Sequence, residues 1–305
     1  MIKVIQKHYL DTLPLVSGRV AALGMFDGLH TGHIKILRKA VKLAKGSGLV
    51  SCATTFSGMD RGGGRELYTI EERMSILEQI GIDELLVLSF PQVKDLSPED
   101  FMSRMLLGSM RAKAIVSGFD YTFGKGGQGD VDMLAKFAKT NDIRYDVVSE
   151  QKLAGNDRKI SATWMREALA EGDAVTASKL CGGRNYFYTG RVEEGKKLGR
   201  QLGFPTANVS IPEDKFVVKR GVYAVRAYLG NRELRGIADI GNKPTVEGDM
   251  KDRLEVHIFD FDEDIYGAKL KTELVKFIRP EKKFGGLDEL KAEVGRNIAA
   301  AKEII

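Results

Sequence analysis

The chain has 305 residues, of which 43% are hydrophobic and 29% are charged, and its formal net charge is +5. This length allows two domains, each with its own core, and the composition is ordinary for a globular protein. We expect a cytoplasmic protein that binds neither a membrane nor nucleic acid, because no apolar run reaches the roughly 18 residues of a spanning helix and no basic block is interleaved with aromatic residues.

The first half of the chain alternates between strand-like and helix-like segments. Strand-like runs are expected at 18–26, 48–56, 83–90, 112–119 and 143–150. Apolar residues recur at helical spacing in 34–48, 69–81, 97–110 and 130–141. Such alternation is typical of a doubly wound parallel sheet flanked by helices. We therefore predict a Rossmann-like α/β domain, in which ligands bind beyond the carboxyl ends of the strands.

The first strand-to-helix connection, residues 24–33, reads GMFDGLHTGH. The first turn of a helix has unpaired N–H groups and the positive end of the helix dipole, which together favour a bound phosphate. His30 and His33 share one face of that turn, Gly28 leaves room for a ligand near the backbone, and Asp27 can hold a cation or orient a histidine. The pattern predicts a phosphate site, although a helix start with incidental histidines has the same sequence.

Two further loops are expected at the same edge of the sheet. One is residues 117–130, SGFDYTFGKGGQGD, which follow the fourth predicted strand. The other is residues 160–173, ISATWMREALAEGD, where Ser161 and Thr163 can cap a helix that carries Arg166 near its start. Both loops are therefore candidates for the walls of the ligand site.

The second half of the chain is rich in glycine and in residues that favour strands. Short strand-like segments with turn signals between them are expected at 221–230, 232–241, 253–261 and 269–280. This pattern predicts an antiparallel β-barrel, and the residues after Gly286 predict a closing amphipathic helix. We place the domain boundary at the change in composition, so that residues 1–183 form the first domain and residues 184–305 the second.

Two stretches of the second half contain candidate ligands. The segment GFPTAN, Gly203 to Asn208, places Thr206 and Asn208 on one side of an extended chain. Their oxygen atoms suit Mg²⁺ that carries nucleotide phosphates, although a capped turn gives the same pattern. Glu255 and His257 similarly share one face of a predicted strand, which is also what a solvated strand face looks like.

Seven motifs occur together in a specific order and spacing: GMFDGLHTGH, SGFDYTFG, ISATWMREAL, LGFPTANV, GVYAVRA, IGNKPTV and LEVHIFDFDEDIYG. In this order and spacing they resemble the bifunctional bacterial riboflavin kinase/FMN adenylyltransferases, also called FAD synthetases. The resemblance spans nearly the whole chain. It implies two activities: phosphorylation of riboflavin to FMN by the second domain, and adenylyl transfer from ATP to FMN, giving FAD and pyrophosphate, by the first.

The first domain resembles the nucleotidylyltransferases of the His-x-Gly-His superfamily. The resemblance implies that His30 and His33 contact the ATP phosphates and that Arg166 lies near the departing pyrophosphate. It also implies further ATP- or phosphate-binding residues: Gly24, Phe26, Asp27, Gly28, Ser161 and Thr163. The flavin-binding residues implied are Asp120, Phe123 and Gly124 in this domain and Arg279 in the second.

The second domain resembles riboflavin kinase. The resemblance implies that Thr206 and Asn208 bind the Mg²⁺ on ATP, that Lys196 and Thr206 contact ATP, and that Glu255 is the base that takes the proton from the ribityl 5′-hydroxyl. The cofactor implied is Mg²⁺. The small-molecule partners implied are ATP, riboflavin and FMN as substrates, with FMN and FAD as products.

Three positions in the first domain depart from the family pattern. Ala162 replaces a second serine, Gly127 stands where many relatives have a basic residue, and TFSGMDR at 55–61 lacks a Pro-His-Pro. A riboflavin kinase whose first domain only binds nucleotide is therefore an alternative. Two others are a flavin-binding regulator without activity and an adenylyltransferase with a different phosphorylated acceptor. The sequence does not indicate the oligomeric state.

Overall fold

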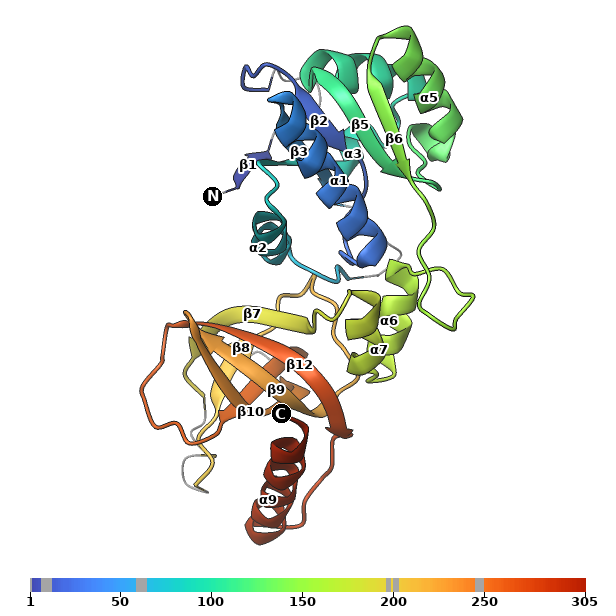
Figure 1. Cartoon of the computed structure of the whole chain (residues 1–305). Helices are drawn as coiled ribbons and strands as arrows, with labels where there is room; N and C mark the ends of the chain where they lie inside the picture. Colours follow the sequence, from blue (N-terminus) through green and yellow to red (C-terminus); the bar gives the residue numbers. More distant parts are fainter. Residues whose placement is uncertain (1, 7–12, 59–64, 196–198, 200–202, 245–249) are drawn as a thin grey trace. The chain divides into compact units, whose positions relative to one another are not determined.

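The computed structural model describes residues 2–6, 13–58, 65–195, 199, 203–244 and 250–305. The chain forms two compact units, which are described separately (Figure 1). Unit 1 contains Met1–Gly64 and Tyr68–Ala162, and unit 2 contains Arg65–Leu67 and Thr163–Ile305. We predicted a boundary between residues 183 and 184 that separates the domains of the two activities, and this boundary stays a prediction.

Unit 1 is built on a parallel sheet, as predicted, and this sheet has six strands. Its strands are β1 (Lys3–Gln6), β2 (Arg19–Ala22), β3 (Val50–Ser57), β4 (Glu84–Ser89), β5 (Ala112–Gly118) and β6 (Arg144–Val148). They pair in the order β1-β4-β3-β2-β5-β6. The short edge strand β1 was not among the predicted elements.

Helices cover both faces of this sheet. They are α1 (Thr31–Ser47), α2 (Ile70–Ile80), α3 (Phe90–Val93), α4 (Pro98–Asp100), the π-helix η1 (Phe101–Ser109), the 3₁₀ turn η2 (Lys125–Gly127) and α5 (Val131–Thr140). Helix α1 packs on β2, β3 and β5, and α2 packs on α1. Apolar side chains of η1 and α5 join those of the strands in one core. The predicted helix 97–110 is thus a single α-turn continued by a π-helix.

The strand order explains where a ligand site is expected in unit 1. From β2 the chain proceeds to β3 and β4 on one side of the sheet, and then returns to β5 and β6 on the other side. In doubly wound sheets, the crevice outside the carboxyl ends of the strands at such a reversal is where ligands bind. The segment 24–33 follows β2 directly, so it lies at this position.

Unit 2 is a closed antiparallel barrel with a helix at the end of the chain, again as predicted. The strands are β7 (Tyr186–Glu193), β8 (Ala207–Ser210), β9 (Gly221–Leu229), β10 (Arg232–Pro244), β11 (Met250–Ile258) and β12 (Lys269–Arg279). Helix α9 (Leu287–Ile304) packs on β9, β10 and β12. Helices α6 (Ala162–Ala170) and α7 (Ala174–Leu180) precede the barrel.

A short segment from the β3–α2 connection belongs to unit 2. Glu66 forms a β-bridge with Lys215, whose side chain is completely buried. The Lys215 ammonium donates hydrogen bonds to the carbonyl oxygens of Leu67 at 2.8 Å and Phe187 at 3.0 Å, and lies 4.5 Å from the centre of the Tyr186 ring. A buried lysine needs such partners, since an unpaired buried charge is costly. These contacts fix residues 65–67 to the barrel.

Candidate active sites

Helix α1 of unit 1 begins at two stacked histidines. His30 is the N-cap, with extended backbone, and its Nδ1 accepts a hydrogen bond from the His33 backbone N–H at 3.4 Å. The two imidazole rings are nearly parallel, with centroids 3.8 Å apart, and the Phe26 ring meets His33 edge-on. The structure therefore brings the two predicted histidines together at a helix N-terminus, where the helix dipole favours an anion.

His33 is held in its uncharged form. Its pKa lies well below the usual value, chiefly because burial disfavours the charged ring, and further because His30, Arg73 and Lys159 are positively charged or chargeable neighbours. Among the residues that the structure describes, His33 Nδ1 is buried and has no hydrogen-bond partner. Buried polar atoms are nearly always paired, so this nitrogen is an exception.

The segment that leads into these histidines, residues 24–30, is strained; we call it the histidine turn. Phe26 and Leu29 have positive φ angles of 50° and 43°, which cost free energy for residues with a side chain. Between them, Asp27 is buried, and its Oδ1 lies 3.6 Å from the Arg73 guanidinium. Strain of this kind persists only where the surrounding structure fixes it, and it is common at functional sites.

The three flavin-binding residues predicted in unit 1 differ in their surroundings. Asp120 is exposed and forms an ion pair with Lys159, whose ammonium lies 5.1 Å from the centre of the Phe119 ring. The Phe123 ring is buried in the core and packs against Phe101 at 4.9 Å. Gly124 has a φ of 73°, and an added Cβ would meet the backbone nitrogen of Pro98 at 2.9 Å. Asp120 thus faces solvent, whereas Phe123 serves packing.

The predicted phosphate-binding residues of the third loop lie around the start of α6. The helix begins at Ala162, so Ser161 directly precedes it and Thr163 is already in its first turn. In unit 2, the Arg166 guanidinium donates a hydrogen bond to the Arg65 carbonyl oxygen at 3.3 Å. Arg166 therefore contacts the segment that is fixed to the barrel.

In the barrel, strand pairing places Glu255 directly opposite Asn208. The two residues face each other across β8 and β11, and Thr206 lies two residues before Asn208 on the same side. Leu254 and Val256 are buried, so the alternating Glu255 points out of the barrel. The sequence-predicted metal ligands and base thus gather on one outer face of the sheet.

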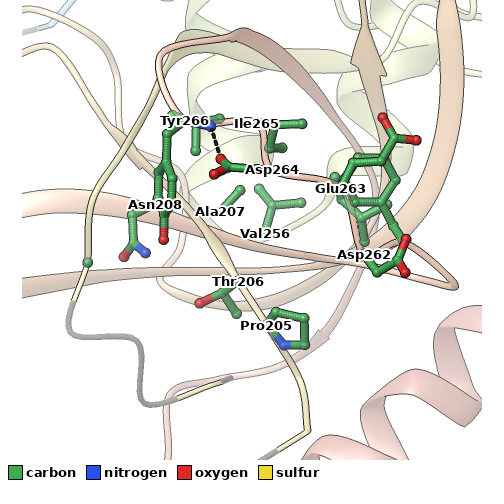
Figure 2. Close-up of a pocket in the computed structure, with 14 residues that line it drawn as sticks. Pro205, Thr206, Ala207, Asn208, Val256, Asp262, Glu263, Asp264, Ile265 and Tyr266 are labelled. Carbon is green, nitrogen blue, oxygen red and sulfur yellow. Dashed lines mark hydrogen bonds between the residues drawn. The ribbon is translucent and has the colours of Figure 1, made fainter. Parts of the chain in front are cut away.

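A cavity of about 200 Å³ opens beside this face (Figure 2). Its lining residues come from the end of β7, the start of β8, the end of β11 and the segments next to these strands: Val192, Gly195, Pro205, Thr206, Ala207, Asn208, Val256, Ile258, Phe261, Asp262, Glu263, Asp264, Ile265 and Tyr266. A Cβ on Gly195 would lie only 2.3 Å from the Asn208 amide nitrogen, so glycine is needed there. Glu255, by contrast, lies on the side of β11 opposite to the lining residue Val256.

The remaining predicted residues are Arg279 and Lys196. Arg279 is bound to α9, because its guanidinium Nε lies 3.2 Å from Asn297 Oδ1 and 3.3 Å from Glu293 Oε1. Its predicted contact with flavin stays a prediction. Lys196 lies outside the described residues.

Sequence reasoning missed two features of these sites. Arg73 is completely buried beside Asp27. It lies three and four residues before Ile76 and Leu77, which are buried on the same helix, and this helical spacing would have indicated that its charge faces inward. The acidic side chains of 262–264 line the barrel cavity, with Asp264 accepting a hydrogen bond from the Tyr266 backbone N–H (Figure 2). The consecutive carboxylates were visible in the sequence, but an exposed loop has the same pattern.

Known families match both parts of the chain. The FAD synthetase family matches residues 14–164, and the riboflavin kinase family matches residues 182–305. The bifunctional riboflavin kinase/FMN adenylyltransferase of Bacillus subtilis is 36% identical over 91% of this chain and 90% of its own length. The protein of the same name from Escherichia coli K12 is 35% identical over 97% of this chain and 95% of its own length.

A solved structure is similar over the whole chain. It is described as a macrolide-efflux protein from Streptococcus pneumoniae, is 30% identical, and covers 99% of both chains with a TM-score of 0.85. In the part of the present chain that the structure describes, every helix is too short or too polar to cross a membrane.

Proposed function

This chain belongs to the bifunctional riboflavin kinase/FMN adenylyltransferase family, and we propose that it carries out both reactions: phosphorylation of riboflavin to FMN, and adenylation of FMN to FAD. The observation that carries the proposal is that two family matches lie on separate parts of one chain, residues 14–164 and 182–305. A kinase with a purely nucleotide-binding first domain is less well supported, because the matched relatives carry both names over nearly their full length.

In the adenylyl transfer that we propose for unit 1, a phosphate oxygen of FMN attacks the α-phosphorus of ATP and pyrophosphate departs. The nucleophile is already an anion, so the protein needs to align the reactants and neutralise charge rather than remove a proton. His30 and His33 suit the triphosphate, because they stand at a helix N-terminus with a buried, unpartnered ring nitrogen. Arg166 is proposed to neutralise the departing pyrophosphate.

In the kinase reaction proposed for unit 2, the ribityl 5′-hydroxyl of riboflavin attacks the γ-phosphorus of ATP and ADP departs. Here the nucleophile is a neutral alcohol, so a carboxylate that accepts its proton accelerates the reaction. Glu255 is our candidate for this base, supported by its position opposite Asn208 on the outer face of the barrel.

We propose that Thr206 and Asn208 hold the Mg²⁺ of the ATP. The donor set fits, since Mg²⁺ is usually bound by one or two protein oxygens together with substrate phosphates. Both residues border the same cavity, and Gly195 leaves the space that the Asn208 amide occupies. When bound, the ion would neutralise charge on the phosphates during transfer.

Chromatography of the products from riboflavin, ATP and Mg²⁺ tests this function. A bifunctional chain converts riboflavin to FMN and then to FAD, whereas a kinase alone stops at FMN. Purified FMN supplied with ATP should give FAD and pyrophosphate directly. Absence of any flavin product would instead favour a regulator that binds flavin. The small-molecule substrates follow from the family, and the cytoplasmic location stays a prediction.

A further inference from the structure

Arg73 on α2 is a completely buried cation in unit 1. Its Nε donates to the Tyr68 carbonyl oxygen at 2.9 Å, its Nη1 donates to Thr55 Oγ1 at 2.7 Å, and its Nη2 lies 3.6 Å from Asp27 Oδ1. The Thr69–Glu72 capping box fixes the start of α2 immediately before it. The guanidinium is therefore held at three sides by groups of fixed position.

Two of these contacts lead to the histidine turn. Asp27 belongs to the turn itself and lies between Phe26 and Leu29, the two residues with positive φ. The second route passes through Thr55, whose hydroxyl accepts from Arg73 and donates to the Met25 carbonyl oxygen at 2.8 Å. One buried cation thus reaches both the backbone and a side chain of a strained segment that ends at the N-cap His30.

We propose that Arg73 is a positioning residue for adenylyl transfer: through Asp27 and Thr55 it fixes the strained histidine turn, and so sets the position of His30 and His33 relative to the nucleotide. This inference rests on the proposed function of unit 1. It assigns Arg73 no contact with the substrate. A strained turn without this support would relax toward ordinary backbone angles and shift the histidines.

The positive charge of Arg73 also favours the stacked arrangement of His30 and His33. It is one of the neighbouring charges, with His30 and Lys159, that add to burial in lowering the pKa of His33. A neutral His33 can stay stacked on His30 at 3.8 Å, whereas two charged rings would repel each other at that distance.

Arg19 provides a matched comparison within the same sheet. It is also completely buried, and its guanidinium is bound by Glu84 at 2.6 Å, by the Met110 carbonyl at 3.2 Å and by the Pro14 carbonyl at 2.9 Å. It lies at the first residue of β2, at the end of the strand away from the histidine turn. Arg19 and Arg73 therefore share burial and pairing but differ in what they support.

The test compares Arg73→Lys with Arg19→Lys in the full chain. Lysine keeps the charge but cannot reproduce three directed contacts. We expect Arg73→Lys to lower kcat for FAD formation from FMN by about 10–100-fold, the size expected when a reacting group is misplaced by about 1 Å. The KM for ATP and the kinase rate should change much less. Arg19→Lys should keep the parent kcat, although it lowers the thermal midpoint. Equal kcat values in the two variants would overturn the proposal.

Thr55→Val gives an independent measurement that does not remove a buried charge. It deletes only the hydroxyl between Arg73 and the Met25 carbonyl, so we expect a smaller loss of kcat in a folded chain. The double variant Arg73→Lys/Thr55→Val should lose less than the product of the single effects, because both act through one path. If the kcat loss of the double variant equals the product of the two single losses, Arg73 and Thr55 do not act through the same contacts. If the proposed function itself is wrong, the parent chain makes no FAD; if only this inference is wrong, the parent is active and Arg73→Lys matches Arg19→Lys.

Discussion

The candidate sites of the two units, proposed for two different phosphate-transfer reactions, contain different types of functional groups. At the candidate site of unit 1, the groups are imidazoles and a helix N-terminus, supported by the buried pair Asp27–Arg73. At the candidate site of unit 2, they are neutral oxygen donors and carboxylates on a strand face and a loop. The difference follows the nucleophile: an already anionic phosphate needs alignment and electrostatic stabilisation, whereas a neutral hydroxyl needs a base.

The two sites also differ in how their geometry is fixed. In the barrel, regular antiparallel register sets Glu255 opposite Asn208, so the positions follow from the strands themselves. In unit 1, the histidines follow a turn with two non-glycine residues at positive φ, which depends on contacts from other elements. We therefore expect adenylyl transfer to be more sensitive than the kinase to substitutions outside the site.

The sharpest test of the contrast is removal of the proposed base. Glu255→Gln keeps the shape of the side chain but cannot take a proton, so kinase turnover should fall by about 10²–10⁴-fold while ATP binding changes little. FAD formation from supplied FMN should be unchanged. Glu233→Gln, which alters an exposed carboxylate on β10, is the control and should be fully active. Wild-type kinase turnover in Glu255→Gln would remove this carboxylate from the mechanism.

The complementary variant is His33→Ala. We expect FAD formation from FMN to fall by about 10²–10³-fold, the usual loss when one stabilising donor is removed, with riboflavin phosphorylation intact. His257→Ala serves as the crossed control, because this histidine lies in the barrel and its Nδ1 is bonded to the Pro205 carbonyl oxygen. It should leave FAD formation from FMN unchanged. Undiminished FAD synthesis by His33→Ala would show that the stacked histidines are structural.

Substitutions of Arg166 test whether a residue of unit 2 takes part in adenylyl transfer. Its helix belongs to unit 2, whereas its proposed role belongs to adenylyl transfer. Arg166→Ala should slow transfer about 10–100-fold in both directions, as pyrophosphate exchange would measure, and Arg166→Lys should recover only part, because a point charge cannot make bidentate contacts. If both variants exchange pyrophosphate at the parent rate, the leaving-group contact lies elsewhere.

A smaller effect is expected from Asn208→Ala. The substitution deletes one proposed metal ligand and leaves Glu255 in place, so the Mg²⁺ concentration for half-maximal kinase rate should rise several-fold, with less change at saturating Mg²⁺. A titration of riboflavin phosphorylation against Mg²⁺ measures this. The same titration of FAD formation is the internal control. An unchanged Mg²⁺ requirement would place the ion on other groups.

The last prediction concerns stability rather than turnover. Lys215→Met leaves the carbonyls of Leu67 and Phe187 without their buried donor, so the unfolding free energy of the barrel should fall by about 1–3 kcal/mol. Thermal unfolding followed by the tyrosine signal measures the change. Lys219→Met is the control: it removes an exposed ammonium that donates a long hydrogen bond to the Glu171 carbonyl oxygen and lies 3.8 Å from the Glu171 carboxylate. Equal stability of the two variants would argue against a structural role for Lys215.

Much of this architecture was predictable because its signals are local. The alternation of apolar strands and amphipathic helices indicated the parallel sheet, and His30 and His33 stood at a recognisable helix start. The four-residue strand β1 was missed because it has too few residues for a periodic pattern.

What could not be predicted depends on contacts between residues far apart in the chain. Arg73 lies 46 positions after Asp27, and no local pattern joins them. The composition of segment 65–67 does not assign it to the barrel unit. The contact that does so is made with Lys215, which lies 148 residues away from Leu67 in the sequence. The same holds for the cavity, whose walls come from segments as distant as Val192 and Tyr266.

The assignment of residues 65–67 to unit 2 has a consequence for biosynthesis. At a translation rate of about 5–20 residues per second, Lys215 is made roughly 7–30 s after Leu67, the residue whose carbonyl it binds. Throughout that interval the connection between β3 and α2 has been synthesised while its anchoring partner does not yet exist. The nascent first unit must therefore tolerate an unanchored connection, and its final form is reached only when the barrel has been synthesised.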